Sequence, residues 1–253
     1  MTSRFIGGFI GAAQFLTRVP IRLRRAPDLT AAVPWFPVVG ALIGTFVGAV
    51  AAGMMELVPA SVAAGVAVIV GVLVTGAFHE DGLADTADAM GGWTPERRRE
   101  ILKDSRHGSY GVAAMCATIV LRILCVATLS PAAAFAGLVA AHTLGRGAAV
   151  GVMGTAGSVP QDGLGADFTR TLSRSSAVVG VLAALAITAV ATGWWVAPLA
   201  LAATIGAALV TRLAKRAFGG ISGDILGAVE QVGECLVLIV VTGLALRHNL
   251  WWT

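Results

Sequence analysis

The fold class is decided by the apolar run "VPWFPVVGALIGTFVGAVAAGMM", Val33–Met55, which contains no charged residue. A helix of about 20 apolar residues is long enough to cross the hydrocarbon core of a bilayer. The rest of the chain has the same character: 57% of its residues are hydrophobic, 13% are charged and its mean hydropathy is +0.83. Soluble domains carry about 25% charged residues. The sequence therefore predicts an all-α, polytopic helical membrane protein.

We expect about seven spans, all within a single integral-membrane domain that covers residues 1–253. They are Val33–Met55, Ala60–Phe78, Tyr110–Leu129, Ala132–Met153, Ala177–Trp194, Val196–Lys215 and Ile225–Leu246. The earlier apolar stretch Phe5–Leu16 is too short to cross the bilayer. We expect it to lie in the membrane interface or to re-enter the membrane.

Basic residues gather on one side of these spans. Of the 18 lysines and arginines, 15 precede the first span or follow the second, fourth and sixth: Arg4, Arg18, Arg22, Arg24, Arg25, Arg97, Arg98, Arg99, Lys103, Arg106, Arg170, Arg174, Arg212, Lys215 and Arg216. Lysine and arginine are enriched in cytoplasmic loops. This bias predicts a cytoplasmic N-terminus, cytoplasmic long loops and a C-terminus on the outer side of the membrane. The net charge of +4 reflects the same bias and does not indicate a nucleic-acid partner.

The stretch "HEDGLADTADAMGG", His79–Gly92, concentrates negative charge at the cytoplasmic end of the second span. We interpret it as a helical continuation of that span. At about 100° per residue, Asp81, Asp85 and Asp88 then lie within about 60° of one another, and Glu80 flanks them.

Carboxylates on one helix face repel each other, and a divalent cation removes the repulsion. All-oxygen ligands suit Mg²⁺ or Mn²⁺, so we predict Glu80, Asp81, Asp85 and Asp88 as metal ligands. Gly82 has no side chain and lets a substrate phosphate approach the helix backbone. The alternative interpretation is a solvated acidic loop at the membrane surface.

A second stretch, "TPERRREILKDSRHGSYG", spans Thr94–Gly111. Thr94 as N-cap and Pro95 as first residue predict a short helix to about Lys103. The segment that follows carries anion-binding and metal-binding side chains: Asp104, Ser105, Arg106, His107 and Ser109. Arg106 can bind two phosphate oxygens, and Asp104 can serve as a metal ligand or a general base. For Arg97–Arg99 the favoured reading is snorkelling at the interface.

The third stretch is "GGISGDILGA", Gly219–Ala228, at the start of the last span. Its glycines permit a tight backbone path whose N–H groups can meet an anion. We therefore predict Ser222 and Gly223 as substrate-binding residues and Asp224 as a further metal ligand. The alternative is that Ser222 or Asp224 only caps the helix.

Five ionisable residues fall inside predicted spans: Arg122, His142, Arg146, Glu230 and Glu234. Such residues are costly in a bilayer and usually face the protein interior or a wet cavity. Arg146 lies about two turns from the cytoplasmic end of its helix, within reach of a substrate phosphate, so we predict a catalytic role. Arg122 is deeper, and pairing with a glutamate is the favoured interpretation.

Six motifs, in this order, resemble the cobalamin (5′-phosphate) synthase family: "FLTRVP" (Phe15–Pro20), "FPVVGALIG" (Phe36–Gly44), "HEDGLADTADAMGG", "LKDSRHGSYG" (Leu102–Gly111), "GRGAAV" (Gly145–Val150) and "GGISGDILGA". The resemblance covers essentially the whole chain. It implies the activity of an adenosylcobinamide-GDP ribazoletransferase, in which a hydroxyl of α-ribazole or its 5′-phosphate attacks a phosphate of adenosylcobinamide-GDP and GMP leaves.

Within that chemistry, Mg²⁺ on Asp81, Asp85 and Asp88 would neutralise the phosphates, and Arg106 or Arg146 would stabilise developing charge. His107 or a carboxylate would take the hydroxyl proton. Membrane lipid is an expected partner, and the sequence leaves open whether the chain forms a homo-oligomer.

Two other functions remain possible from the sequence. A CDP-alcohol phosphotransferase also carries an acidic membrane helix, but its pattern has Ala-Arg where this chain has Ala84–Asp85. A cation or proton transporter would use carboxylates near the bilayer midplane, such as Glu230 and Glu234. Most acidic residues here lie instead near the cytoplasmic ends of spans. We therefore predict that the three stretches line one cavity that opens to the cytoplasm, with Arg146 on its wall.

Overall fold

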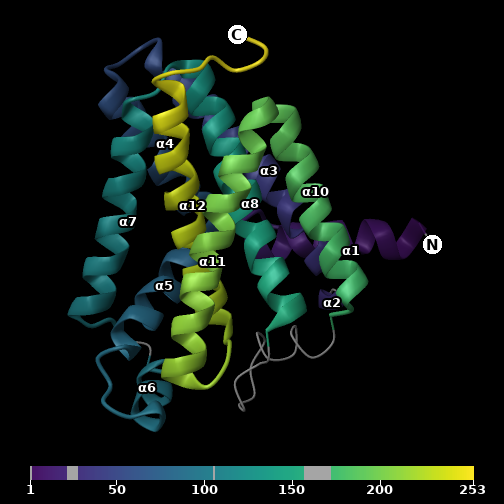
Figure 1. Cartoon of the computed structure of the whole chain (residues 1–253). Coiled ribbons are helices and arrows are strands. Elements are labelled where there is room, and N and C mark those ends of the chain that lie inside the picture. The colour runs from purple at the N-terminus through teal and green to yellow at the C-terminus, as the bar shows by residue number, and fades with distance from the viewer. Residues whose placement is uncertain (1, 22–27, 105, 157–171) are drawn as a thin grey trace.

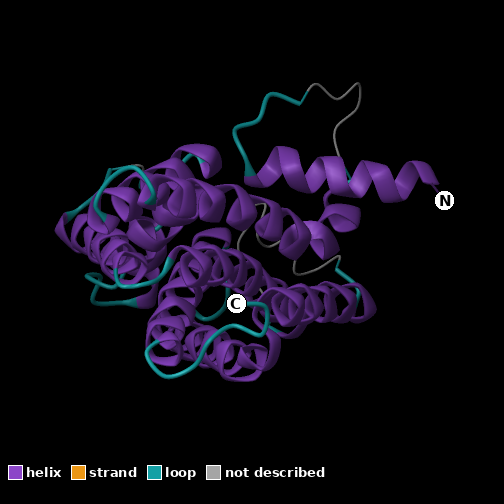
Figure 2. Cartoon of the chain, turned by 90° about the horizontal axis from the view of Figure 1, so that it is seen from above, coloured by secondary structure: helices purple, strands orange, loops and turns teal. Residues whose placement is uncertain are grey.

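The computed structural model describes residues 2–21, 28–104, 106–156 and 172–253, and within these ranges the chain forms helices and no strand. Long helices run side by side in one bundle, and α1 extends away from it (Figures 1 and 2). The elements are α1 (Thr2–Leu16), α2 (Leu29–Ala32), η1 (Val33–Trp35), α3 (Phe36–Met55), α4 (Ala60–Thr75), α5 (Phe78–Ala89), α6 (Pro95–Ile101), α7 (Ser109–Ala127), α8 (Pro131–Thr155), α10 (Arg174–Thr192), η2 (Gly193–Trp195), α11 (Val196–Phe218) and α12 (Gly223–Ala245).

The prediction of a polytopic, all-helical membrane protein is confirmed. Within the described residues, five continuous helical stretches are long and apolar enough to span a membrane, and a bent pair, α4 with α5, passes the same test together. One of the five stretches, Arg174–Phe218, contains both α10 and α11, which Figure 1 shows as two helices that join at η2. When α10 and α11 are counted separately and α4 is counted without α5, each of the seven expected spans matches one helix, with bounds that differ by a few residues.

The expectation that His79–Met90 continues the second span is wrong. Residues 78–89 do form a helix, but α5 is bent by 88° from α4. The break lies at Gly76 and Ala77, which both have left-handed backbone angles, with φ of 67° and 58°. Arg18 covers this corner: its backbone N–H donates to the carbonyl of Val74 at 2.8 Å, and its side chain lies where a β-carbon on Gly76 would be. At 12 residues, α5 is too short to cross the bilayer alone.

Helix α8 is the centre of the bundle and packs against α3, α10, α11 and α12. Its closest neighbour is α3, because glycines on α3 let the two backbones approach. A β-carbon on Gly44 would lie 2.6 Å from the carbonyl oxygen of Leu138, and one on Gly48 would lie 3.0 Å from Cα of Phe135. Small residues at such seams provide the close packing that holds membrane helices together.

Helix α1 is attached to the bundle through aromatic contacts. The rings of Phe5 and Phe9 meet Trp35 edge-on, with centroids 4.4 and 5.6 Å apart, and Phe15 stacks on Phe36 at 5.6 Å. Aromatic pairs in these geometries contribute beyond the area they bury. The placement of this helix in the membrane interface stays a prediction.

Candidate active site

On the outward face of α5, Asp81 and Asp85 lie close to His107, which belongs to another segment. His107 Nε2 lies 3.4 Å from Oδ1 of Asp81, and its Nδ1 lies 3.6 Å from Oδ1 of Asp85. One ligand atom from each of the three side chains falls within 4.8 Å of the others. Asp81 is exposed, Asp85 is partly buried and His107 comes from the segment that precedes α7. We call these three residues the acidic site.

Like charges crowd this site. Burial raises the pKa of Asp85, the charges of Asp81 and Asp224 add to the effect, and together they bring it from 3.8 to about 6. A carboxylate with a raised pKa is one whose ionised form lacks compensation in the protein. A divalent cation supplies that compensation, so the donor set and its electrostatics fit a hard metal ion.

The N-terminus of α12 lies directly against α5, and Gly82 is the point of contact. A β-carbon on Gly82 would lie 2.8 Å from the carbonyl oxygen and 3.0 Å from Cα of Asp224. Gly227 is the facing residue on α12, where a β-carbon would lie 3.3 Å from Cα of Gly82. The structure thus gives Gly82 a packing role, and it brings Asp224 to the acidic site.

Ser222 is the N-cap of α12, since its Oγ accepts from the N–H of Ile225 at 3.4 Å. Its hydroxyl also donates to Oδ2 of Asp224, again at 3.4 Å. The capping alternative is therefore confirmed for Ser222. Gly223 is the first residue of the helix that it caps, and no contact tests the predicted substrate-binding role of either residue.

Asp88, predicted as a metal ligand, has a structural role that its place in the sequence did not indicate. Its Oδ2 accepts from the N–H of Gly108 at 2.6 Å and its Oδ1 accepts from the N–H of Gly111 at 2.8 Å. These N–H groups belong to the start of α7, where the helix provides no partners of its own and favours negative charge. Asp88 therefore caps α7 from α5 and fixes the segment that carries His107.

Asp104 and Arg106 form an exposed pair. The Arg106 guanidinium donates to both Asp104 oxygens, at 3.0 and 2.7 Å, and its hydrogen bond lowers the pKa of Asp104 to about 2. Ser109 is an exposed residue at the start of α7, and the predicted site residue Ser105 lies outside the described residues. The short helix α6 begins as expected, with the Thr94 hydroxyl accepting from the N–H of Arg97 at 3.2 Å.

Arg99 joins α6 to the end of α11 by donating to the carbonyl of Phe218 at 3.1 Å. The three stretches singled out in the sequence therefore meet at one end of the bundle, although they are far apart along the chain. This part of the geometric prediction is confirmed.

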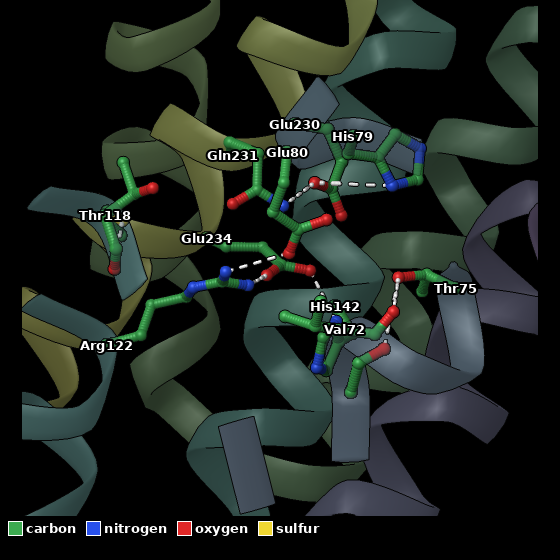
Figure 3. Close-up of polar contacts among 12 residues, drawn as sticks. Val72, Thr75, His79, Glu80, Thr118, Arg122, His142, Glu230, Gln231 and Glu234 are labelled. Atoms are coloured by element: carbon green, nitrogen blue, oxygen red, sulfur yellow. Dashed lines mark hydrogen bonds and ion pairs between the residues drawn. The ribbon is translucent and has the colours of Figure 1, made fainter. Parts of the chain in front are cut away.

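The inward face of α5 joins a buried ionic cluster, and Figure 3 labels most of its members. Its members are His79 and Glu80 of α5, Arg122 of α7, His142 and Arg146 of α8, and Glu230, Gln231 and Glu234 of α12, and none is more than 6% exposed. Arg122 lies on one side of the glutamates and bridges two of them, at 2.8 Å to Glu80 and 3.0 Å to Glu234. The guanidinium of Arg146 lies 2.6 Å from Glu230 and 2.9 Å from Glu234.

Two predicted site residues, Glu80 and Arg146, thus belong to the buried ionic cluster and not to the acidic site. The predicted pairing of Arg122 with a glutamate is confirmed. A signal was present in the sequence for Glu80, since at about 100° per residue its side chain lies off the helix face that Asp81 and Asp85 share. Ligand atoms of His142, Glu230 and Glu234 also lie within 4.8 Å, but Arg146 already supplies a positive charge to both glutamates.

The placement of Arg146 on the wall of a shared cavity is wrong, because its side chain is only 2% exposed. A cavity of about 810 Å³ lies instead between α8, α10 and α11, and none of the predicted site residues lines it. The sequence could not indicate this cavity, which depends on how three helices pack.

Comparison with known proteins gives a consistent result. The family model described as cobalamin-5-phosphate synthase matches residues 8–242. A relative in Azorhizobium caulinodans, named adenosylcobinamide-GDP ribazoletransferase, is 36% identical over 97% of this chain and 99% of its own length. Relatives of the same name in Bradyrhizobium diazoefficiens and Shewanella frigidimarina are 38% and 36% identical, over 90% and 94% of this chain and 90% and 95% of their own lengths. No solved structure matches the chain.

Proposed function

Because this chain belongs to the cobalamin-5-phosphate synthase family, we propose that it is an adenosylcobinamide-GDP ribazoletransferase that acts late in cobalamin synthesis. A hydroxyl oxygen of α-ribazole, or of its 5′-phosphate, forms a bond to the phosphorus that is linked to the corrinoid. The bond from this phosphorus to the bridging oxygen breaks, and GMP leaves with that oxygen. The products are adenosylcobalamin, or its 5′-phosphate, and GMP.

The observation that carries this proposal is the convergence of Asp81, Asp85 and His107 at the end of the bundle where the N-terminus of α12 also lies. An attacking hydroxyl and a diphosphate must be held together for such a reaction, and positioning supplies much of the rate in phosphoryl transfer. We propose that Asp81 and Asp85, with Asp224 beside them, hold Mg²⁺. When bound, the ion would neutralise charge on the diphosphate and on the leaving GMP.

His107 is the group of this site best placed to take the hydroxyl proton. Its ring nitrogens lie 3.4 Å from Asp81 and 3.6 Å from Asp85. In the neutral ring one nitrogen donates its N–H to a carboxylate, the other accepts the hydroxyl proton, and the two carboxylates stabilise the imidazolium once it forms. Arg106 is exposed on the same segment and is available to a substrate phosphate after it releases Asp104. Asp88 holds the start of α7, and with it this segment, in place.

We further propose that the site faces the cytoplasm, from the inner membrane of a bacterium. The end of the bundle that holds the acidic site also carries the basic residues of α6 and of the last turns of α11. Arg247 follows α12 at the opposite end. A bias of this kind is typical of cytoplasmic loops.

The test is GMP release by the purified protein in liposomes that are supplied with adenosylcobinamide-GDP and α-ribazole. EDTA should abolish turnover and Mg²⁺ or Mn²⁺ should restore it. Asp85→Asn should lower the rate at least about a hundredfold, the scale of losing one group that stabilises transition-state charge. The matched control is Glu56→Gln, an exposed carboxylate between α3 and α4 at the opposite end of the bundle. Full activity in EDTA would exclude the metal, and no GMP release under any condition would exclude the reaction.

A further inference from the structure

The cavity between α8, α10 and α11 is a groove with a mostly apolar lining. It has a volume of about 810 Å³, and much of its lining consists of glycine and alanine. Gly147 and Gly151 line it from α8, Ala184 from α10, and Ala203 and Ala207 from α11. A groove of this volume is within the size range of sites that bind small ligands.

One end of the groove is basic. Arg212, Lys215 and Arg216 line it there, on the last two turns of α11, and all three are exposed. Within the described part of the chain, none of the three forms an ion pair with a carboxylate. The groove therefore joins an apolar surface to a cluster of positive charge that has no carboxylate partner among the described residues.

The outer faces of the two flanking helices are apolar. Leu182 on α10 is 58% exposed, and Leu209 on α11 is 60% exposed. In a membrane these faces meet lipid tails, and the groove opens between them. Positive residues at the end of a membrane helix lie where lipid phosphates lie, and basic pockets between spans bind anionic head groups.

We propose that this groove is a binding site for one anionic phospholipid. An acyl chain lies along the glycine and alanine walls, and the phosphate lies against Arg212, Lys215 and Arg216. The occupant fills the space between α11 and the directly packed pair of α8 and α10, in which a β-carbon on Gly147 would lie 2.7 Å from Cβ of Ala184. This site is separate from the acidic site and does not depend on the proposed function.

Two other occupants fit the groove less well. A corrinoid carries amide groups around its rim, and the uncharged polar side chains of the lining are Thr155, Thr204 and Thr211. Burying amides without partners is costly. A second copy of this chain would have to insert side chains between α10 and α11, beside three positive charges.

The experiment is native mass spectrometry of the purified protein, released from detergent with palmitoyl-oleoyl phosphatidylglycerol or with the matching phosphatidylcholine. We expect one phosphatidylglycerol per chain, retained at least about tenfold better than phosphatidylcholine, a difference of about 1.4 kcal/mol. The double variant Arg212→Gln, Arg216→Gln should lose this preference. The matched control Arg97→Gln, Lys103→Gln, which removes two exposed charges near α6, should keep it.

A second pair of variants tests the apolar walls. Ala208→Phe places a large side chain into the groove from an exposed position of its lining, and should lower phosphatidylglycerol retention at least about tenfold. Leu209→Phe, on the lipid-facing side of the same helix, should not. Glycerol 3-phosphate, which has the charge without the chains, should not compete.

Four results would overturn the proposal. They are equal retention of the two lipids, retention that is unchanged in Arg212→Gln, Arg216→Gln, displacement of the lipid by adenosylcobinamide-GDP, and a dimer mass that Ala208→Phe abolishes.

Discussion

Breaking the buried ionic cluster at Arg122 should destabilise the protein far more than removing Arg122 together with Glu80. In the variant Arg122→Met, Glu80 loses the partner of its Oε1, and its Oε2 already has no hydrogen-bond partner among the described residues. Glu234 is less affected, because Arg146 stays 2.9 Å away and His142 remains in contact with it. The cost of the single variant therefore falls on Glu80.

The expected magnitudes follow from the cost of a buried charge without a partner. Removing one member of a buried ion pair typically costs about 3–5 kcal/mol, whereas replacing both members by apolar side chains of similar volume is often close to neutral. The double variant Glu80→Met, Arg122→Met removes one charge of each sign and leaves the net charge of the cluster unchanged. We expect Arg122→Met to cost about 3–5 kcal/mol, the double variant under about 2 kcal/mol, and the pair to show a coupling of at least about 2 kcal/mol.

The assay is reversible unfolding in mixed micelles, with the same double-mutant cycle on an exposed pair as control. Arg97 and Glu100 are 2.9 Å apart, but their side chains are 64% and 66% exposed, so their coupling should be about 0.3–0.5 kcal/mol. If the buried pair shows no more coupling than this control, or if the double variant is as unstable as Arg122→Met, the cluster is not held together by these charges and the reasoning is refuted.

Three further outcomes are expected. The affinity of the acidic site for Mn²⁺ should be full above pH 6 and fall about tenfold per pH unit below it, because protonation of Asp85, whose pKa is about 6 without metal, opposes binding. The measurement is a Mn²⁺ titration followed by electron paramagnetic resonance, and a constant affinity between pH 5 and 7 would contradict the prediction. Asp88→Asn removes the charge and one of two accepting oxygens at the start of α7, and should cost about 1–3 kcal/mol in the unfolding assay; an unchanged stability would refute the capping role. Gly82→Ala should lower the free energy of unfolding by about 1–3 kcal/mol, because its β-carbon would lie 2.8 Å from the Asp224 carbonyl oxygen. The control Gly65→Ala, where nothing lies within 4 Å, should change it by no more than about 0.5 kcal/mol. Equal effects of the two variants would mean that α12 does not lie against α5.

The sequence by itself determined the fold class and most of the span boundaries. Uncharged runs such as Val33–Met55 have one stable solution in a bilayer, a helix that satisfies its own backbone. Capping signals are local too: Thr94 begins α6 as expected, and Ser222 begins α12 as the capping alternative had it. The sequence also indicated that the segments around Asp85, His107 and Asp224 work together, through their positions at the ends of spans and through a resemblance to a known family.

Only the tertiary structure decided how α5 divides its polar residues between two environments. Helical spacing places Asp81 and Asp85 on one face of α5, but it does not determine which helices pack against the other faces. The corner at Gly76 and Ala77 turns α5 by 88°, which aims Glu80 at Arg122 of α7 and Asp88 at the N–H groups of Gly108 and Gly111. These partners lie between 20 and 42 residues away along the chain. The groove between α8, α10 and α11 is decided in the same way, because a cavity is a property of several helices packed together and no single helix encodes it.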